Sequence, residues 1–235
     1  MGPTGQLQIQ WLGHSTFVVT SPGGKRIVFD PWLEANPKCP DEHKKISKAD
    51  LILVTHGHAD HIGEVVSIAR TTGAPVIAIY ELAKWFEKKG IKPVHGINKG
   101  GTITIAGIDV TMVSAQHSSG LEVDGQVTYL GEPAGYILRL EDSRSLYFAG
   151  DTDVFGDMSL IKQVHAPEIA FLPIGDYYTM GPKGAALAAE LLGVQQVVPM
   201  HYGTFPLLTG TPAELRTLLP HGIQLLELQP GETAV

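Results

Sequence analysis

The sequence predicts an α/β (α+β) fold, a four-layer αββα sandwich with an internal pseudo-two-fold repeat. Residues 13–30 read as an apolar strand, a Pro-Gly-Gly turn and a second apolar strand ending in an aspartate, and residues 134–151 repeat the order strand, polar turn, strand and aspartate. Each copy is followed by an apolar strand, a helical pattern and another strand. Two such halves, each a sheet with helices on one side, bury both apolar faces when the sheets pack together.

The elements of the first half follow its hairpin. After Asp30 the chain has a long loop rich in Pro and Lys, and then the apolar strand 50–55. A helix over 62–70 and a strand over 75–80 follow in this half. An amphipathic helix over 81–89 and strands over 102–105 and 108–113 are also predicted before the second hairpin.

The second half repeats the order after Asp151. A strand is predicted over 168–174, a helix over 182–192 with a proline in its first turn, and a strand over 196–200. Thr211, Pro212 and Glu214 have the residue types of an N-cap, a first-turn proline and a capping-box acid, so a closing helix is expected within 211–219.

Length and composition predict one globular domain over residues 1–235. Hydrophobic residues make up 43% of the chain and charged residues 17%, which is enough apolar material for a sizeable core. The formal net charge of −7 disfavours nucleic acid as the principal ligand, because phosphate neutralisation needs a positive surface. The longest apolar runs, about seven or eight residues, are far below the roughly 20 that cross a bilayer, so no membrane segment is expected.

Cysteine content and the amino terminus predict a reducing, cytoplasmic location. Cys39 is the single cysteine and cannot form an internal disulfide. The first residues contain neither the charged region nor the apolar region of a secretory signal. Cys39 lies in the long loop after Asp30, where it is expected to be accessible but without a base beside it.

The main chemical motif is the run His-Gly-His-Ala-Asp-His at residues 56–61, directly after the apolar strand 50–55. It provides four metal-ligand side chains within six residues: His56, His58, Asp60 and His61. The first two can turn their imidazoles to one cation, whereas Asp60 and His61 begin the next turn and can face a second. The alternative is a solvated turn with accidental histidines, and so many ligand-type side chains in so short a run argue against it.

Three further ligand-type residues follow apolar strands and are expected at the same rim of the fold: His117, Asp151 and His201. His117 would complete the first site and His201 the second, while the two carboxylate oxygens of Asp151 would lie between the cations. The sequence therefore predicts two divalent metal ions per chain. The nitrogen and oxygen donors favour Zn²⁺ and also suit Mn²⁺ or Fe.

Two neighbouring cations can lower the pKa of a water between them and present hydroxide to an electrophilic carbon or phosphorus. This predicts hydrolysis with a metal-bridging hydroxide, with Asp60 and His14 as catalytic residues. His14 is the candidate proton donor to the leaving group, and a structural role at the start of a strand is its alternative. Asp176 is expected either to orient a ligand imidazole or to form a turn.

Six segments spread over nearly the whole chain resemble the metallo-β-lactamase superfamily: WLGHSTF, VTHGHADHIGE, SAQHSSG, AGDTD, GDYYTMGP and PMHYGTFP. Within it the chain resembles bacterial and archaeal metal-dependent hydrolases related to the L-ascorbate-6-phosphate lactonases. The resemblance implies the αββα metallo-β-lactamase fold, a dinuclear site and hydrolysis of an ester, lactone, thioester, amide or phosphodiester. The absence of a suitable cysteine ligand, and His61 beside Asp60, disfavour penicillin hydrolysis.

A small-molecule substrate is expected, because the core consumes the chain and leaves no appended lid or arm. Ser118 and Ser119 offer hydroxyl donors to an anionic substrate, or form a simple turn. The alternatives to a small-molecule hydrolase are an RNA phosphodiesterase or nuclease, a dinuclear iron redox protein, and a metal-bound scaffold without catalysis. For a homo-oligomer, the candidate contact residues are Trp32, Leu33, Phe205 and Leu207.

Overall fold

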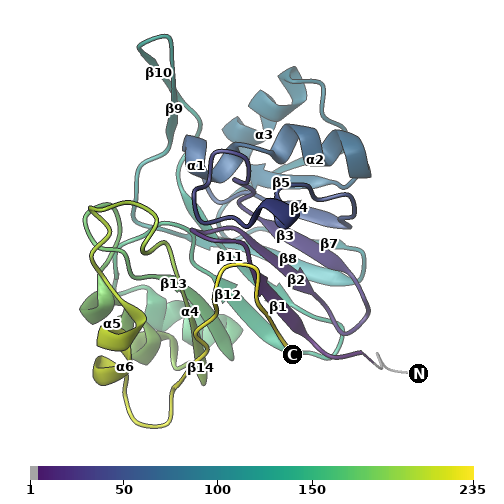
Figure 1. The fold of residues 1–235 in the computed structure, drawn as a ribbon. Helices are drawn as coiled ribbons and strands as arrows, with labels where there is room; N and C mark the ends of the chain where they lie inside the picture. Colours follow the sequence, from purple (N-terminus) through teal and green to yellow (C-terminus); the bar gives the residue numbers. More distant parts are fainter. Residues whose placement is uncertain (1–4) are drawn as a thin grey trace.

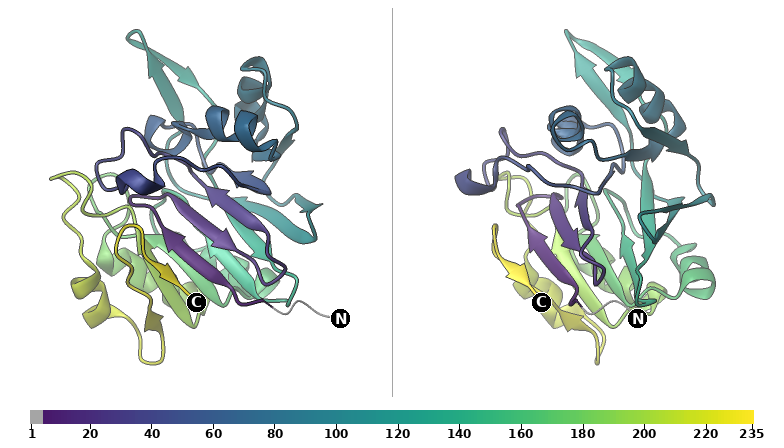
Figure 2. Two further views of the ribbon diagram at one scale, coloured as in Figure 1. Left: turned by 45° about the vertical axis from the view of Figure 1, so that its right-hand side comes forward. Right: turned by 90° about the vertical axis from the view of Figure 1, so that its right-hand side faces the viewer.

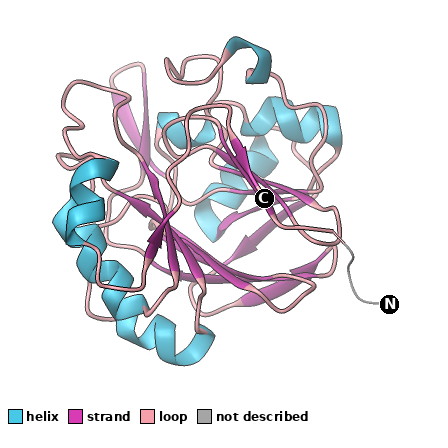
Figure 3. Cartoon of the chain, turned by 60° about the horizontal axis from the view of Figure 1, so that its bottom comes forward, coloured by secondary structure: helices cyan, strands magenta, loops and turns pink. Residues whose placement is uncertain are grey.

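The computed structural model describes residues 5–235, in which two seven-stranded sheets pack face to face (Figure 1). Residues 1–4, on which part of the prediction about a secretory signal depends, lie outside the described residues. Helices cover the outer faces of the pair of sheets (Figure 3). The predicted four-layer αββα arrangement is therefore confirmed.

The first sheet contains the amino-terminal strands, in the spatial order β16-β1-β2-β3-β4-β5-β6. Its strands are β1 (Gln8–Trp11), β2 (Phe17–Thr20), β3 (Arg26–Phe29), β4 (Leu51–Leu53), β5 (Val76–Ile79), β6 (Val94–Ile97) and β16 (Thr233–Ala234). The helices of this half are η1 (Asp41–His43), α1 (Ala59–Ile62), α2 (Val65–Thr72) and α3 (Tyr80–Lys88).

The second sheet has the order β15-β14-β13-β12-β11-β8-β7. Its strands are β7 (Thr102–Ile105), β8 (Ile108–Ser114), β11 (Ala134–Arg139), β12 (Ser145–Phe148), β13 (Ile169–Pro173), β14 (Gln196–Met200) and β15 (Gln224–Leu225). The helices of this half are α4 (Met158–His165), α5 (Pro182–Leu192) and α6 (Pro212–Leu218).

The internal repeat is visible in the strand pairing. In the first sheet the antiparallel hairpin β2–β3 continues into parallel pairing of β3, β4, β5 and β6. In the second sheet the hairpin β11–β12 continues into parallel pairing of β12, β13, β14 and β15. The carboxyl ends of equivalent strands therefore meet at one rim, which is where an α/β scaffold presents functional side chains.

Four phenylalanines join the two sheets. Phe29 of β3 stacks on Phe148 of β12 with ring centroids 4.3 Å apart, and Phe17 of β2 meets Phe171 of β13 edge to face at 5.0 Å. All four rings are completely buried. Each such ring contributes roughly 1.5–3 kcal/mol on burial, so this layer fixes the strands that end at the rim.

The predicted elements have their expected type, and α5 and β14 have the expected bounds. The helix predicted over 62–70 is in fact two helices, because Gly63 and Glu64 separate α1 from α2. The predicted N-cap of α6 is confirmed, since the hydroxyl of Thr211 accepts a hydrogen bond from the amide of Glu214 at 3.2 Å.

Several surface predictions are wrong. Trp32 and Leu33, expected to be subunit contacts, are buried at the start of the long loop, and Cys39 in the same loop is buried as well. The loop lies against the first sheet, so its apolar side chains belong to the core. Phe205 and Leu207 are exposed, as a contact role requires.

An arm that the sequence did not predict projects from the body of the molecule. β9 (Gly120–Val123) and β10 (Gln126–Tyr129) form a separate two-stranded sheet, drawn in teal above the rim in Figure 1 and projecting in both views of Figure 2. Its turn is Asp124-Gly125, with φ of 52° and 75°, the conformation that closes two-residue hairpins. The expectation of a chain without any arm is therefore wrong.

Across residues 5–235, no helix has the length and apolar character needed to cross a membrane.

Candidate metal centre

The ligand-type residues of both halves meet at the rim. His56 follows β4, His117 follows β8, Asp151 follows β12 and His201 follows β14, whereas His58, Asp60 and His61 lie in the turn into α1 and in that helix. The structure thus brings all seven predicted metal ligands together from four separate segments of the sequence. Gly150, with φ of 63°, lets Asp151 approach this rim, because a Cβ there would lie 2.7 Å from the Cβ of Thr55.

Two groups of donor atoms form at the rim. His56, His58 and His117 place one nitrogen each within 4.8 Å of one another, with Nε2 of His56 only 2.9 Å from Nδ1 of His58. His14, Asp60, His61 and His201 form the second group by the same criterion. Apart from His14, these are the two groups that the sequence predicted.

Asp151 lies between the two groups. Its Oδ2 is 3.0 Å from Nε2 of His201, 3.3 Å from Nε2 of His61, 3.6 Å from Nε2 of His117 and 3.9 Å from Nε2 of His56. Burial would raise the pKa of Asp151, but the adjacent His201 and His61 hold it well below its usual range. An ionised carboxylate therefore lies within 3.9 Å of Nε2 of four imidazoles, two from each donor group.

Asp30 and Thr55 support the cluster from beneath, and the sequence assigned neither a role. Asp30 accepts hydrogen bonds from the amide of Thr55 at 2.8 Å, from the Thr55 hydroxyl at 2.6 Å and from Nδ1 of His61 at 2.8 Å. Since the Thr55 hydroxyl donates to Asp30, its oxygen accepts from Nδ1 of His56 at 3.0 Å. Both imidazoles thereby carry a proton on Nδ1, and their Nε2 atoms are directed toward Asp151.

His14 has no exposed surface and does not line the cavity described below. Its Nε2 lies 3.1 Å from Oδ2 of Asp60, and its Nδ1 lies 2.9 Å from the hydroxyl of Thr204. Its carbonyl also accepts from the amide of His201 at 3.0 Å. This placement gives His14 a positioning role toward Asp60 and His201, and proton donation by His14 stays a prediction.

Asp176 does not orient a ligand imidazole. Its carboxylate is exposed, and its Oδ1 accepts from the amide of the next residue, Tyr177, at 2.8 Å. Asp176 and Tyr177 both have positive φ, 65° and 55°, so the second half makes a tight turn where the first half carries its histidines. The turn-forming alternative is the correct one.

Strained backbone concentrates around the cluster. His14, Asp30 and His201 have φ of 55°, 41° and 54°, a conformation that side chains other than glycine rarely adopt. Such strain costs on the order of 1–3 kcal/mol per residue and persists only where the surrounding structure enforces it. Here the two sheets and the hydrogen bonds above enforce it, and the result is that donors from both halves point to one place.

The donor set fits divalent metal ions. Nε2 of His61 and Oδ1 of Asp151 are buried and make no hydrogen bond within the described chain. A buried unpartnered polar atom costs roughly 1–3 kcal/mol, which coordination to a cation offsets. Imidazole nitrogens and carboxylate oxygens are ligands for Zn²⁺, Mn²⁺ and Fe.

The electrostatics of the cluster also fit a divalent cation. Burial lowers the pKa of His56, His58 and His117, so these imidazoles are neutral and available as ligands. Burial acts in the same direction on His61, but the carboxylates of Asp151 and Asp30 hold its pKa well above the usual value. His61 is therefore protonated, and its positive charge takes the place of the charge of a metal ion. Metal binding is expected to release this proton.

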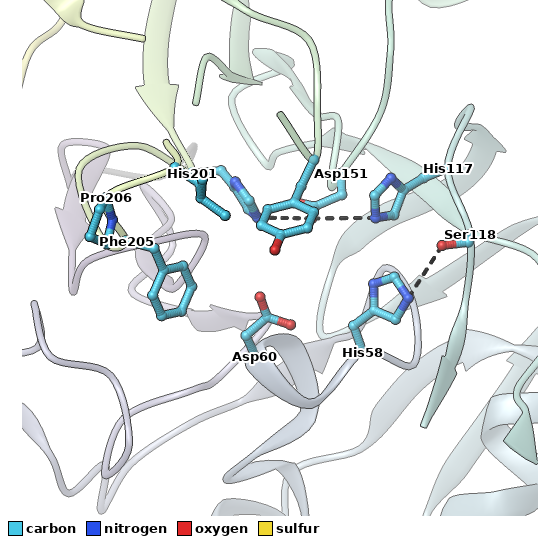
Figure 4. A pocket seen from close by; sticks show the side chains of 10 residues that line it. His58, Asp60, His117, Ser118, Asp151, His201, Phe205 and Pro206 are labelled. Carbon is cyan, nitrogen blue, oxygen red and sulfur yellow. Dashed lines mark hydrogen bonds and ion pairs between the residues drawn. The ribbon is translucent and has the colours of Figure 1, made fainter. Parts of the chain in front are cut away.

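A cavity of about 670 Å³ opens directly onto the cluster (Figure 4). Its lining residues are His58, Asp60, His117, Ser118, Asp151, Tyr178, His201, Phe205, Pro206 and Leu207. In Figure 4, Phe205 and Pro206 lie on one side, His58, His117 and Ser118 on the other, and Asp60 between them. The cavity therefore has a wall of ligand-type side chains and a wall of apolar ones.

Comparison with known proteins identifies the family. The family model described as "Beta-lactamase superfamily domain" matches residues 25–202, more than half of the chain. The chain belongs to the metallo-β-lactamase superfamily. It is 49% identical to the UPF0173 metal-dependent hydrolase of Koribacter versatilis over 97% of each chain. It is 42% identical to a relative of the same description from Methanopyrus kandleri, over 97% of this chain and 99% of that one.

Among solved structures, the metallo hydrolase Igni18 of Ignicoccus hospitalis superposes with a TM-score of 0.83 at 35% identity, covering 97% of each chain. The superfamily resemblance predicted from the six motifs is thus confirmed, as is the metallo-β-lactamase fold. The chain is a metal-dependent hydrolase whose His and Asp clusters can bind metal.

The buried state of His14 predicts a measurable pH dependence of stability. Burial, reinforced by His201, lowers the pKa of His14 from 6.5 to about 4. The folded chain therefore favours neutral His14, and this contribution is present above pH 6.5 and lost as the pH falls toward 4. In chelator-treated protein we expect the acid-induced drop in melting temperature to be smaller for His14→Gln than for wild type, by roughly 4 °C.

Differential scanning calorimetry at pH 7.5 and pH 5 measures this difference. His221→Gln is the matched control, because His221 is exposed and belongs neither to the cluster nor to the lining of the cavity. Equal acid-induced drops in His14→Gln and wild type would contradict the prediction.

Proposed function

We propose that the protein hydrolyses an ester or lactone of a small, uncharged molecule that carries an apolar group. The observation that carries the proposal is the two-sided cavity, in which the metal-ligand cluster faces the apolar wall formed by Phe205, Pro206 and Leu207. No lysine or arginine is among its lining residues in the described chain, so no cationic side chain stands ready for a phosphate or carboxylate of the substrate. This favours acyl substrates over the phosphodiesters and anionic substrates that the sequence also allowed.

The residues of this chain would hold two metal ions in the arrangement predicted from the sequence, His56, His58 and His117 around one and Asp60, His61 and His201 around the other, with Asp151 between. Metal ions bound there would lower the pKa of coordinated water and polarise a carbonyl oxygen. We propose Zn²⁺ as the native metal because five of the seven ligands are imidazoles.

The carboxylate of Asp60 and the apolar wall would bind water and orient the substrate. Asp60 reaches the cavity with its side chain 30% exposed, and His14 fixes one of its oxygens. Burial would raise the pKa of Asp60, but His61 and His14 hold it well below the usual range, so the carboxylate stays ionised and can accept a hydrogen bond from water. The apolar wall orients the substrate and excludes solvent on the side opposite the ligands.

Truncation of the apolar wall tests how the substrate is held. Phe205→Ala is expected to raise KM roughly 10- to 150-fold for p-nitrophenyl butyrate, because removing an aromatic contact costs roughly 1.5–3 kcal/mol. The effect on p-nitrophenyl acetate, whose acyl group barely reaches the wall, should be small. Leu218→Ala on α6, an exposed residue outside the cavity, is the control. Equal KM changes for both esters would contradict this role of Phe205.

A substrate panel tests the proposed reaction. We expect metal-loaded protein to hydrolyse p-nitrophenyl esters and alkyl lactones faster than bis-p-nitrophenyl phosphate or single-stranded RNA. The same samples should contain two metal ions per chain by elemental analysis, and fewer in His58→Ala. Faster cleavage of the phosphodiesters would overturn the acyl-substrate proposal, and protein carrying iron instead of zinc would revive the redox alternative.

A further inference from the structure

The arm, defined as residues 120–129, packs on the body of the protein at its base, where Leu121 lies against the hydrophobic core, while its outer part presents apolar side chains to solvent. β9 and β10 pair only with each other and join neither large sheet. Val123, Val127 and Tyr129 are 53%, 75% and 65% exposed. A lone two-stranded hairpin is marginally stable in water, so apolar side chains presented on one indicate a surface that another molecule covers.

The tip of the arm is acidic. Glu122 and Asp124 flank Val123, and residues 120–129 contain no lysine or arginine. Neither carboxylate has a basic partner within 4.0 Å among residues 5–235. The covering surface therefore needs both positive charge and an apolar floor.

The chain itself carries such a surface between β1, β2 and the long loop. We define the basic concavity as the pocket of about 260 Å³ lined by Gln10, Leu12, Val18, Arg26, His43, Lys45, Ile46, Ser47 and Lys48. No acidic side chain is among these lining residues, although the net charge of the protein is −7. Within the described part of the chain, Arg26, Lys45 and Lys48 have no carboxylate within ion-pair distance.

We propose that the arm of one copy docks into the basic concavity of a second copy of this chain. Val123 would contact the partly exposed Ile46, which lies among the lining residues with the buried Leu12 and Val18, while the flanking carboxylates of Glu122 and Asp124 would meet the cationic rim. Arm-to-arm pairing at the tips is disfavoured because it would bring four carboxylates together. Each copy would give one arm and receive one, either by reciprocal exchange between two copies or around a closed ring.

Docking would also fix one side of the cavity mouth. The arm begins directly after Ser118 and Ser119. Ser118 lines the cavity, and the hydroxyl of Ser119 accepts a hydrogen bond from the amide of Gly57 at 3.1 Å. Assembly would thus hold the loop that carries His117.

Charge exchange between two variants tests the proposal by sedimentation analysis. Wild type is expected to sediment as a multiple of 25.2 kDa at low salt and to dissociate as salt rises. Glu122→Lys with Asp124→Lys, and separately Lys45→Glu with Lys48→Glu, should each weaken self-association by roughly a hundredfold. Mixing the two variants should restore assembly, because the arm of each then matches the concavity of the other.

Two controls separate docking from general effects on the surface. Lys88→Glu with Lys92→Glu changes charge elsewhere, and Val164→Thr removes another exposed valine, on α4. Neither change should alter the mass, whereas Val123→Thr should weaken association. Circular dichroism verifies that each variant is folded. A monomeric wild type at low salt, or folded charge variants that assemble alone as well as wild type or fail to assemble when mixed, would overturn the proposal.

Discussion

Asp151→Asn is expected to abolish metal retention and to lower the hydrolytic rate on the order of a thousandfold, the scale of losing a central charge-stabilising group. Asparagine keeps the shape of the side chain and removes only its charge. In the native chain that charge lies within 3.9 Å of Nε2 of four imidazoles, two from each donor group. An amide cannot bridge two cations as a carboxylate does, so both groups lose their shared ligand.

Elemental analysis after dialysis against metal-free buffer, paired with rates on p-nitrophenyl butyrate, measures both effects. Asp153→Asn is the matched control, since Asp153 lies two residues further along and is exposed, with its carboxylate capping the amide of Val154 at 2.7 Å. Native metal content in Asp151→Asn would remove Asp151 from the ligand set. Loss of metal in the control as well would indicate that the whole loop, and not the central carboxylate, had failed.

The layer architecture was predictable because its signals are local and strong. Hairpins that end in aspartate, parallel-type apolar strands and the proline-started α5 each depend on a few neighbouring residues. Helix α4 was not predicted, and the strands that the sequence did not reveal are β1, the edge strands β6, β15 and β16, and the two strands of the arm. The structure of these strands depends on pairing with another strand, and a short stretch of sequence contains no information about that strand.

The ligand cluster was predictable for a different reason. Each ligand follows an apolar strand, and parallel strands present their carboxyl ends at one rim. What the sequence analysis did not identify is the set of polar residues that lie behind the ligands. Asp30 occupies in the first half the position that Asp151 occupies in the second, and the repeat could have identified it. Asp176 was a misleading counterpart, because positive φ at residues 176 and 177 turns the second half away from the cluster.

Asp30→Asn replaces none of the proposed metal ligands, but it is expected to lower both the metal affinity and the hydrolytic rate by roughly 10–100-fold. The two oxygens of Asp30 receive three donors, two from Thr55 and one from Nδ1 of His61. Asparagine has one acceptor oxygen, so at least one donor would face an NH₂ group. His61 would then lose the partner that fixes its tautomer, and His56 would be loosened through Thr55.

The same change is expected to destabilise the fold by roughly 3–5 kcal/mol, because it breaks a completely buried pair and leaves its partners unsatisfied. For a chain of this size that corresponds to a drop in melting temperature on the order of 10 °C. Asp176→Asn serves as the control, since it alters the exposed aspartate of the other half; it should leave both quantities unchanged.

Metal titration separates a positioning role from simple unfolding. If Asp30 acts by orienting His61 and His56, Asp30→Asn retains every ligand, and excess metal should restore much of the hydrolytic rate and part of the melting temperature. Asp151→Asn lacks the shared ligand itself, so excess metal should not rescue it. Failure of metal to rescue Asp30→Asn at a temperature where circular dichroism shows it folded would mean that Asp30 does more than position the two imidazoles.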